Sequence, residues 1–486
     1  MASSPPSFDT LWPVGLSALS RTMIDSLSDE DFQRLCQHVY NRARSHGLSR
    51  RSAQARVRRI QDARLGRKIW PDMKAQRPEL FYSRFKPNRI MDSVWPGRSS
   101  KSWRHPVARK EAEYLQLRQF SLVDDPVGTM RQLKRLIEME SSIRVARVDF
   151  KDERVLDIAP YLIWGYMARD MCPFMLGGKI ERPVSKVLEA VELSKFMGIR
   201  FLNQPDDTDV WAFGLRHRSG ADADPANSFA ASIVADKFVE TVNEWLEMLP
   251  DAMELTRAGA RDLNKIITEA LDNAERYGEL SAASGKDGGD WYITGFMARR
   301  PLESPDQDGR EAWYDCHIAM VNLGDTIAET IAATTDPKIS DALRRYTAKH
   351  SGALFRGGCS AETLATVFAM QDGVSARPGP TGTGGKGMMD LVQFTNSIGN
   401  TTDPAHQPVM TVISGKSCVQ FKEIYRCFRR PTSGRPHRQQ YFNTTGGFDD
   451  PPDKDYVFDL DIRFPGTVIA IRFSLDPKVM ESKTGD

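Results

Sequence analysis

The amino-acid sequence predicts an α+β protein, in which a large C-terminal α/β sandwich follows a smaller α/β domain and a basic, helical N-terminal region. Three observations lead to this fold class. In several segments apolar residues recur at three- and four-residue spacing, which indicates amphipathic helices. Between them lie segments rich in β-branched and aromatic residues, which indicate strands. The 486 residues, 40% of them hydrophobic, suffice for two or three domains with separate cores.

The composition also excludes several classes of protein. No apolar run is long enough to span a bilayer, and the N-terminus lacks the charged and apolar regions of a secretory signal. The six cysteines are scattered without a CxxC pair, so we expect neither disulfides nor structural zinc. These features favour a cytoplasmic protein without a membrane partner.

The N-terminal region, residues 1–110, is expected to be partly helical. Ser28 is placed to cap a helix that begins next to it, and residues 50–67 can form a second, basic helix. The density of Pro, Gly, Ser and Trp from Pro87 to Pro106 predicts an extended connector.

Positive charge is concentrated in this region. Residues 41–110 hold 20 Lys and Arg against four acidic residues. Aromatic residues are interleaved with the charges and can stack on bases. The segment can therefore bind nucleic acid or an acidic protein surface. The alternative is a solvated arm that packs on the acidic remainder of the chain.

Residues 111–219 are expected to form a small α/β domain. Helical patterns at 126–139, 158–169 and 183–197 alternate with a strand pattern at 142–150, as in a βαβ crossover. The stretch from Val145 to Gly165 resembles the STAS-like fold of anti-sigma-factor antagonists, where a strand ending in Asp-Phe is followed by a short loop and a helix. A generic α/β module is the alternative.

Residues 225–475 form the third expected domain, after a polar linker. Its predicted strands are 291–299, 313–322, 408–414, 419–425, 456–463 and 467–473, and helices are expected between them. Residues 430–454, rich in Pro, Gly, Asp and Arg, are expected to be an irregular insertion. A tail follows at 476–486.

Glu269 and Asn273 are the first candidate site residues. They lie four positions apart in a predicted helix, so they project from the same side, one turn from each other. A carboxylate and a carboxamide in this arrangement can hold Mg²⁺ or a metal and a water. By itself such a pair is more often two solvated surface residues.

Three glycine-containing segments follow this helix in the sequence. Asn322-Leu-Gly324 ends a predicted strand, and Gly466-Thr467 begins another, where glycine allows the backbone to approach a ligand closely. The third segment leads into a predicted helix, whose N-terminus favours an anion. It contains Gly382, Gly384, Gly385, Lys386 and Gly387.

Two other phosphate-binding motifs fit this glycine segment poorly. A P-loop around Gly385-Lys386 requires Gly where Pro380 stands and Ser or Thr where Gly387 stands. The spacing of Gly382, Gly384 and Gly387 matches a dinucleotide-binding motif, but Pro378-Gly-Pro380 precedes it in place of a strand.

In their order, these segments resemble the GHKL ATPase family, which includes gyrase B, heat-shock chaperones, histidine kinases and anti-sigma-factor serine kinases. The resemblance covers about half the chain and implies a mixed sheet covered by helices. It implies that Asn273 ligates Mg²⁺ on ATP and that Glu269 acts as general base. Gly382, Gly384, Gly385 and Gly387 would cradle phosphates, with charge from Lys386. Thr467 would bond adenine, in a site that includes Asn322 and Gly324.

The sequence departs from the family pattern at two positions. Asn322 stands where the family has the Asp that accepts from the adenine amine, and Thr326 replaces the second glycine. A carboxamide oxygen can still accept this bond, but without charge. Asp325 is a candidate for the missing carboxylate. Residues 325–387 would form a lid, whose length suggests movement.

The resemblance leaves three activities open. The first is an ATPase whose nucleotide state switches the lid and the N-terminal modules, as a homodimer or on a protein partner. The second is an anti-sigma-type serine/threonine kinase. The third is a nucleotide-gated binding module without turnover. The histidine-kinase reading is disfavoured, because no upstream His lies in a helical His-Glu context.

Overall fold

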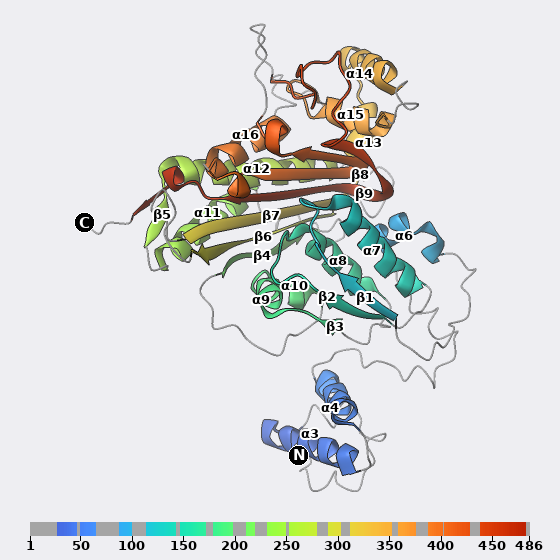
Figure 1. Ribbon diagram of the computed structural model, residues 1–486, viewed down its shortest axis with the longest axis vertical. Coiled ribbons are helices and arrows are strands. Elements are labelled where there is room, and N and C mark those ends of the chain that lie inside the picture. The colour runs from blue at the N-terminus through green and yellow to red at the C-terminus, as the bar shows by residue number, and fades with distance from the viewer. Residues whose placement is uncertain are drawn as a thin grey trace, which may run out of the picture. The chain divides into compact units, whose positions relative to one another are not determined.

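The computed structural model describes residues 27–45, 49–64, 87–99, 113–141, 146–171, 178–197, 210–218, 231–248, 252–278, 290–302, 312–351, 358–375, 387–401, 403–427 and 438–482. The chain divides into two compact units (Figure 1). One consists of residues 1–85 with 172–174, and the other contains the rest of the chain.

The first unit contains a helical hairpin of α3 (Asp29–Ser45) and α4 (Arg50–Arg64). The Ser28 hydroxyl accepts a hydrogen bond from the Asp31 backbone N–H at 3.1 Å, which confirms the expected cap. The two helices pack through a small apolar cluster, which comprises Leu27, Phe32, Leu35, Cys36, Val39, Val57 and Ile60. Val57 and Ile60 are the residues of α4 in this cluster. Much of the rest of this basic helix is exposed to solvent.

The second unit begins with a short helix where a connector was expected. Residues 89–94 form α6 (Arg89–Val94), capped by the Asn88 side chain, which accepts from the Met91 N–H. A 3-10 helix, η2 (Pro96–Ser99), follows. Ile90, Met91 and Val94 are buried. The prediction of an extended connector is therefore wrong for residues 87–99.

A three-stranded parallel sheet organises the next part of the chain. Its order is β1 (Glu113–Leu117), β2 (Ala146–Phe150) and β3 (Gly178–Lys179). Helix α7 (Pro126–Ser141) connects β1 to β2, and α8 (Ala159–Asp170) lies between β2 and β3. The expected βαβ crossover is confirmed. The helix expected at 183–197 is divided into α9 (Arg182–Ala190) and α10 (Leu193–Phe196) at Glu192, whose φ is +60°.

A five-stranded sheet forms the centre of the second unit. Its order is β4 (Val210–Arg218), β6 (Asp290–Pro301), β7 (Ala312–Leu323), β9 (Val457–Ser474) and β8 (Val409–Phe421). Every described pairing in this sheet is antiparallel, so the expectation of a mixed sheet is wrong for these strands. β8 and β9 each join two predicted strands into one long, irregular strand.

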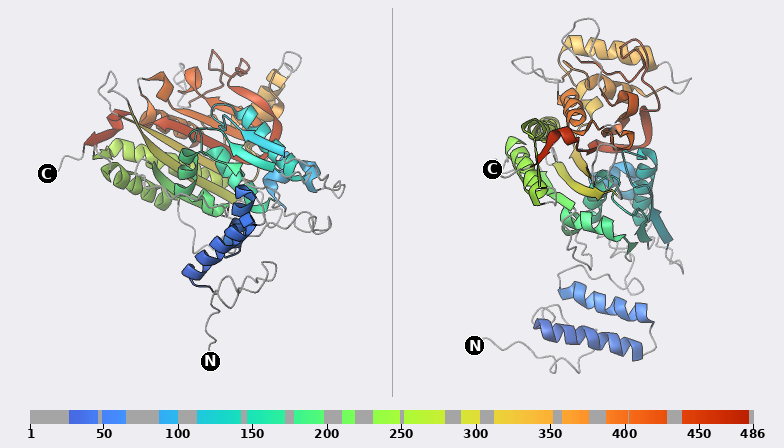
Figure 2. Two further views of the ribbon diagram at one scale, coloured as in Figure 1. Left: turned by 60° about the horizontal axis from the view of Figure 1, so that its bottom comes forward. Right: turned by 60° about the vertical axis from the view of Figure 1, so that its left-hand side comes forward.

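Both faces of this sheet are covered, as Figures 1 and 2 show. On one face lie α11 (Ala231–Met248), α12 (Arg257–Gly278) and α16 (Gly387–Gly399), which pack on alternate strand residues such as Ile293 and Ile318. The residues between them, such as Tyr292 and Ala319, contact the module of α6, α7 and α8 on the other face. Because both faces are covered, β6 and β7 are buried over most of their length.

The region of the expected lid is a group of helices. It contains α13 (Ile327–Ala332), α14 (Pro337–Ser351) and α15 (Ala361–Ala369). The described part of the insertion, from residue 438, packs against them through aromatic rings. Tyr346 lies 5.2 Å from Tyr441 and 5.1 Å from Phe448 between ring centroids. The insertion has no regular helix or long strand in its described part, as expected.

The remaining described elements are short. β5 (Met253–Leu255) pairs antiparallel with β10 (Met480–Ser482), so the predicted tail at 476–486 includes a paired strand. The 3-10 helices are η6 (Pro404–His406), η7 (Glu423–Tyr425) and η8 (Pro477–Val479).

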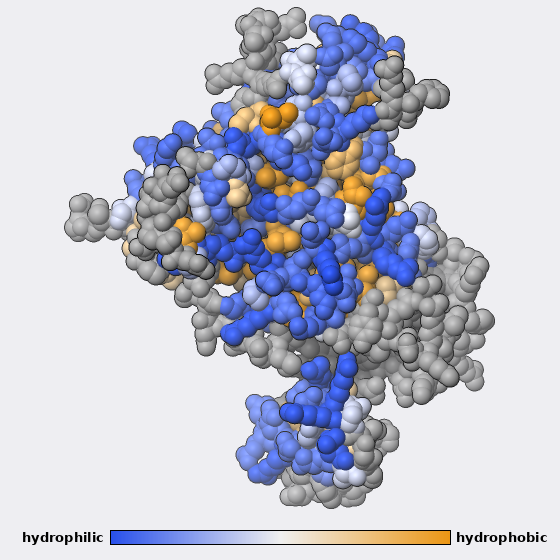
Figure 3. Space-filling view, in the orientation of Figure 1, coloured by the Kyte–Doolittle hydropathy of each residue, from blue (hydrophilic) through white to orange (hydrophobic). Residues whose placement is uncertain are grey.

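The α+β fold class is confirmed, because helices and several sheets make up the described structure. Strand β4 lies within the range predicted for the small domain (111–219) but pairs with β6 in the large sheet. The predicted boundaries of the three domains stay predictions. In the part of the chain that the structure describes, no helix has the length and apolarity required to cross a membrane. Hydrophobic residues appear in Figure 3 as separate areas of a mainly hydrophilic face.

Candidate functional site

Helix α12 carries Glu269 and Asn273 along the rim of its buried face. Its apolar stripe, which includes Leu263, Ile266 and Ile267, is fully buried against the large sheet and its neighbouring helices. Glu269 and Asn273 are partly exposed. The predicted helix is confirmed, and the burial of the stripe fixes which way these two side chains face.

Helix α16 begins in direct contact with this pair. A Cβ atom built on Gly387 would lie 2.8 Å from Glu269 Oε2, 3.0 Å from Asn273 Nδ2 and 3.1 Å from Asn273 Oδ1. Real Cβ atoms are not found below 3.0 Å from such atoms, so only glycine fits here without movement. The first turn of α16, with backbone N–H groups that lack helical partners, therefore faces a carboxylate and a carboxamide from α12.

Two strand residues form a polar group nearby. Asn322 in β7 is the register partner of Thr467 in β9. A Cβ on Gly466, whose φ is +137°, would lie 2.0 Å from the Asn322 carbonyl oxygen and 3.0 Å from the Gly324 nitrogen. Glycine is required at Gly466 both by this close approach and by its φ. The predicted close approach of the backbone to a ligand at these glycines stays a prediction, because the contact seen is between two segments of the protein.

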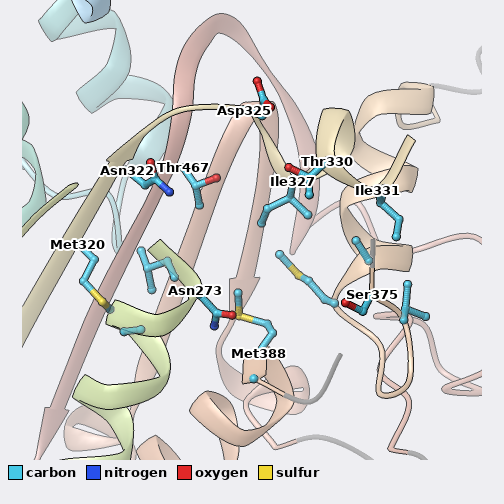
Figure 4. A pocket seen from close by; sticks show the side chains of 16 residues that line it. Asn273, Met320, Asn322, Asp325, Ile327, Thr330, Ile331, Ser375, Met388 and Thr467 are labelled. Carbon is cyan, nitrogen blue, oxygen red and sulfur yellow. The ribbon is translucent and has the colours of Figure 1, made fainter. Parts of the chain in front are cut away.

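A pocket lies between the helices and strands β7 and β9 (Figure 4). Its empty volume is about 950 Å³, including the open mouth. Most of the wall is apolar. The lining residues are Ala270, Asn273, Met320, Asn322, Asp325, Ile327, Thr330, Ile331, Ala369, Met370, Val374, Ser375, Gly387, Met388, Thr467 and Ile469.

The pocket brings together several predicted site residues. Asn273, Asn322, Gly387 and Thr467 all line it. Two predicted residues lie outside the lining: Glu269 is close to Gly387, and Gly324 is close to Gly466. Gly382, Gly384, Gly385 and Lys386 are outside the described residues. Figure 4 shows Asn322 and Thr467 side by side, on the far side of the pocket from Met388.

Sequence reasoning missed most of the wall supplied by the lid helices. Ile327, Thr330 and Ile331 come from α13, and Ser375 follows α15. These positions have ordinary helical spacing and no motif, so their sequence gives no signal for a site. Asp325 was a candidate for a carboxylate near the base, and it lines the pocket.

Helix α13 is held to the strands by a continuous set of hydrogen bonds. The Thr326 side chain and Glu329 form a capping box at its N-terminus. The Ser414 hydroxyl accepts from the Ile327 N–H at 2.8 Å and lies 2.9 Å from the Thr467 hydroxyl. A chain of polar contacts therefore runs from the α13 backbone to a predicted site residue.

Arg463 links two lid helices to β9. Its guanidinium donates to Glu329 of α13 at 2.6 Å and to Glu362 of α15 at 2.5 Å. Burial opposes ionisation of Glu329, but hydrogen bonds from Thr326 and the charge of Arg463 outweigh it and lower the pKa of this carboxyl. The first turns of α13 and α15 are therefore held to β9. Movement of the lid stays a prediction.

Arg438, from the insertion, connects two walls of the pocket. Its side chain bonds both carboxylate oxygens of Asp372, at 2.7 and 3.1 Å, just after α15. It also donates to Asp390 in the first turn of α16. The Asp372 side chain is only 3% exposed. Arg438 therefore ties the segment after α15 to the first turn of α16, and these two segments carry the pocket residues Met370 and Met388.

The described residues contain no group of three or more His, Cys, Asp or Glu that could hold a metal ion. A metal in this pocket would therefore have few protein ligands. Mg²⁺ is commonly held by one or two side chains together with substrate phosphates, and the oxygens of Asn273 and Glu269 are suitable for that arrangement.

Comparisons with known proteins give no match for this chain, whether with protein-family models, with curated proteins or with solved structures. The pocket must therefore be interpreted from its own chemistry.

Proposed function

We propose that the protein binds ATP with Mg²⁺ and hydrolyses it, and that the nucleotide state is passed to the lid helices and the N-terminal modules. The observation that carries the proposal is the contact of Gly387 with both Glu269 and Asn273. It joins an anion-favouring helix N-terminus to a carboxylate and a carboxamide at one end of an apolar pocket. The order of the motifs, which resembles the GHKL family, supports the same ligand.

The residues present suit a magnesium nucleotide. The narrow space over Gly387 suits glycine, and the N–H groups at a helix N-terminus favour an anion such as phosphate. The apolar wall, with polar groups at Asn322, Asp325 and Thr467, suits a purine base. Bound Mg²⁺ would neutralise charge on the phosphates. Asn273 would be its side-chain ligand, and Gly382, Gly384, Gly385 and Lys386 belong to the proposed phosphate segment by sequence alone.

Glu269 is the proposed general base. Its carboxylate lies against the start of α16, where it can orient a water and accept its proton while the water attacks the terminal phosphate. The helix positions the carboxylate through the buried stripe of α12. Thr467 and Asn322 would bind the base and orient the nucleotide relative to Glu269.

The wider proposal concerns partners and location. A protein partner, or a second copy of the chain, would receive the change in the lid. The basic residues 41–110 are proposed to contact nucleic acid, and the STAS-like resemblance of 111–219 remains part of the proposal. A reducing cytoplasm suits the free cysteines among the described residues, four of which are buried.

The test is ATP binding and phosphate release by purified protein carrying single substitutions. Glu269→Gln should lower the hydrolysis rate by about 10²–10⁴-fold and leave ATP affinity nearly unchanged. Asn273→Ala should abolish the dependence of ATP affinity on Mg²⁺. Asp272→Asn, on the same helix but outside the pocket lining, serves as the matched control.

The outcomes separate the alternatives. Phosphate release that requires Glu269 supports the ATPase. Transfer of labelled phosphate to a protein partner identifies a kinase, and retention of intact ATP identifies a binding module. If wild-type protein does not bind Mg²⁺-ATP, or if Asn273→Ala binds it with unchanged Mg²⁺ dependence, the proposal is wrong.

A further inference from the structure

Thr330 is a buried polar residue in the pocket wall. It is only 5% exposed and lines the pocket from α13. Its hydroxyl oxygen is buried and has no hydrogen-bond partner in the described structure. Tyr161 Oη and Trp164 Nε1 are also buried without a partner, but these two residues lie outside the pocket lining.

The lack of a partner for its hydroxyl distinguishes Thr330 from three other helical threonines of this protein. A threonine within a helix commonly donates to the carbonyl four residues earlier. Thr347 does so to Leu343, Thr366 to Glu362 and Thr395 to Leu391, at 2.8–3.0 Å. No such bond is formed by the Thr330 hydroxyl, although its backbone N–H bonds the Thr326 carbonyl normally.

The surroundings of Thr330 indicate what it can contact. Figure 4 shows it on the same side of the pocket as Asp325, across the pocket from Asn273. Its neighbours Ile327 and Ile331 are apolar, so they offer it no hydrogen bond. A buried hydroxyl without a partner destabilises a fold, and a ligand that supplies the partner recovers this loss.

We propose that Thr330 is a further ligand-binding residue, whose hydroxyl hydrogen-bonds the nitrogen-rich edge of a heteroaromatic base held in the pocket. A hydroxyl can donate and accept, so it suits the mixed donors and acceptors of a purine. This inference rests on the proposed function and adds a specificity residue at the base end, away from the phosphates.

The proposal predicts that Thr330→Val lowers the affinity for ATP but does not lower the stability of the ligand-free protein. Removal of the hydroxyl by Thr330→Val keeps the shape of the side chain and eliminates the buried unpaired group. The ligand-free variant should therefore unfold at an equal or higher urea concentration than wild type. Its affinity for ATP should fall by about three- to tenfold, the usual effect of one lost hydrogen bond. A residue with a purely structural role would not move the two measurements in opposite directions.

The experiment compares the full-length wild-type chain, Thr330→Val and Thr330→Ser. Urea unfolding is followed without ligand, and calorimetry measures the Kd of ATP and of adenosine. Thr330→Ser keeps the hydroxyl and should bind both within about twofold of wild type. Thr330→Val should weaken both to the same extent, because both contain the base.

Each remaining outcome is decisive. Equal affinity of Thr330→Val and wild type overturns the role of Thr330 and leaves the proposed function intact. Weaker binding by both variants together with lower stability of Thr330→Val identifies a structural residue and also overturns it. Absence of ATP binding by wild type overturns the proposed function, and the role of Thr330 fails with it.

Discussion

One face of the five-stranded sheet is closed by rings and paired charges, whereas the other leaves a pocket beneath its helices. On the closed face, Phe150 lies 5.5 Å from Tyr161 and 4.8 Å from Trp164 between ring centroids. Arg98 and Glu140 form an ion pair there, with side chains only 2% exposed. On the open face, residues of α12, α13 and α16 line the pocket, and Gly387 lets α16 approach α12 closely.

The difference shows how one sheet can serve both stability and binding. The closed face pairs its charged groups within the chain, as in the bond of Arg472 with Asp124. His317 on this face stacks on Phe296 at 4.4 Å, and burial lowers the pKa of its imidazole to about 3, so it stays neutral. The open face instead places polar groups such as Asn273 and Thr467 along a cavity. Substitutions on the two faces should therefore affect different measurements.

The largest expected effect is on the closed face. Arg98→Met removes one partner of the buried ion pair and leaves Glu140 charged and buried. The free energy of unfolding should fall by about 3–5 kcal/mol, measured by urea unfolding. Arg131→Met breaks a pair with Asp461 that is mostly exposed, so its effect should be below about 1 kcal/mol. Equal effects of the two substitutions on the free energy of unfolding would contradict the conclusion that buried, paired charges stabilise this face.

A second effect on the closed face depends on pH. Burial tends to raise the pKa of Asp315, but hydrogen bonds from His406 and Ser474 outweigh it and hold the pKa at about 2. Since this pKa lies below that of an unfolded Asp, the charged form stabilises the fold above about pH 4, and the gain is lost as pH falls toward 2.

Asp315→Asn should therefore cost about 2 kcal/mol near neutral pH, and the cost should shrink on acidification. Urea unfolding of both proteins between pH 3 and 7 measures it. A difference that stays constant over this range would show that the carboxylate charge is not the stabilising feature.

On the open face, Gly387→Ala is expected to affect binding. The added methyl group would displace the carboxylate of Glu269 and the amide of Asn273, and a lost contact to a charged ligand costs about 1.5–3 kcal/mol of binding free energy. The loss should be seen as weaker ATP binding in calorimetry. Gly447→Ala is the control, because its Cβ would meet only Thr445 Oγ1 at 3.7 Å. Unchanged ATP affinity in Gly387→Ala would place the nucleotide elsewhere.

The smallest expected effect concerns the link between the pocket walls. Arg438→Lys keeps the positive charge but loses the bidentate hydrogen bonding to the Asp372 carboxylate. The loss of about 1 kcal/mol should raise the KM for ATP about fivefold and change kcat little. Arg344→Lys, in an exposed pair with Asp341, provides the comparison. A change confined to kcat would indicate that Arg438 acts on the chemical step.

Much of the fold could be predicted from local patterns. The stripe of α12, the cap at Ser28 and the βαβ crossover depend on residues close in sequence, so spacing alone indicates them. Errors occurred where tertiary contacts decided the outcome. Residues 89–94 form a helix that buries Ile90 and Met91 in the second unit, although the composition around them is typical of a connector.

The candidate site divides in the same way. Glu269 and Asn273 share a helix face because of the period of the helix. Gly466 and Thr467 are neighbours in the sequence, so their proximity is also local. The contact of Gly387 with Glu269 joins residues more than a hundred positions apart. Thr330 faces the pocket only because Arg463 and Ser414 hold α13 against the strands.

By itself, the sequence determined the α+β class, the helices and strands with strong periodicity, and the pairs of polar residues that share one element. Tertiary structure decided which elements meet, that the large sheet is antiparallel and covered on both faces, and which residues of α13 and α15 complete the pocket. The physical reason is that backbone periodicity is a local property. Contacts between elements depend instead on how distant apolar surfaces are buried together.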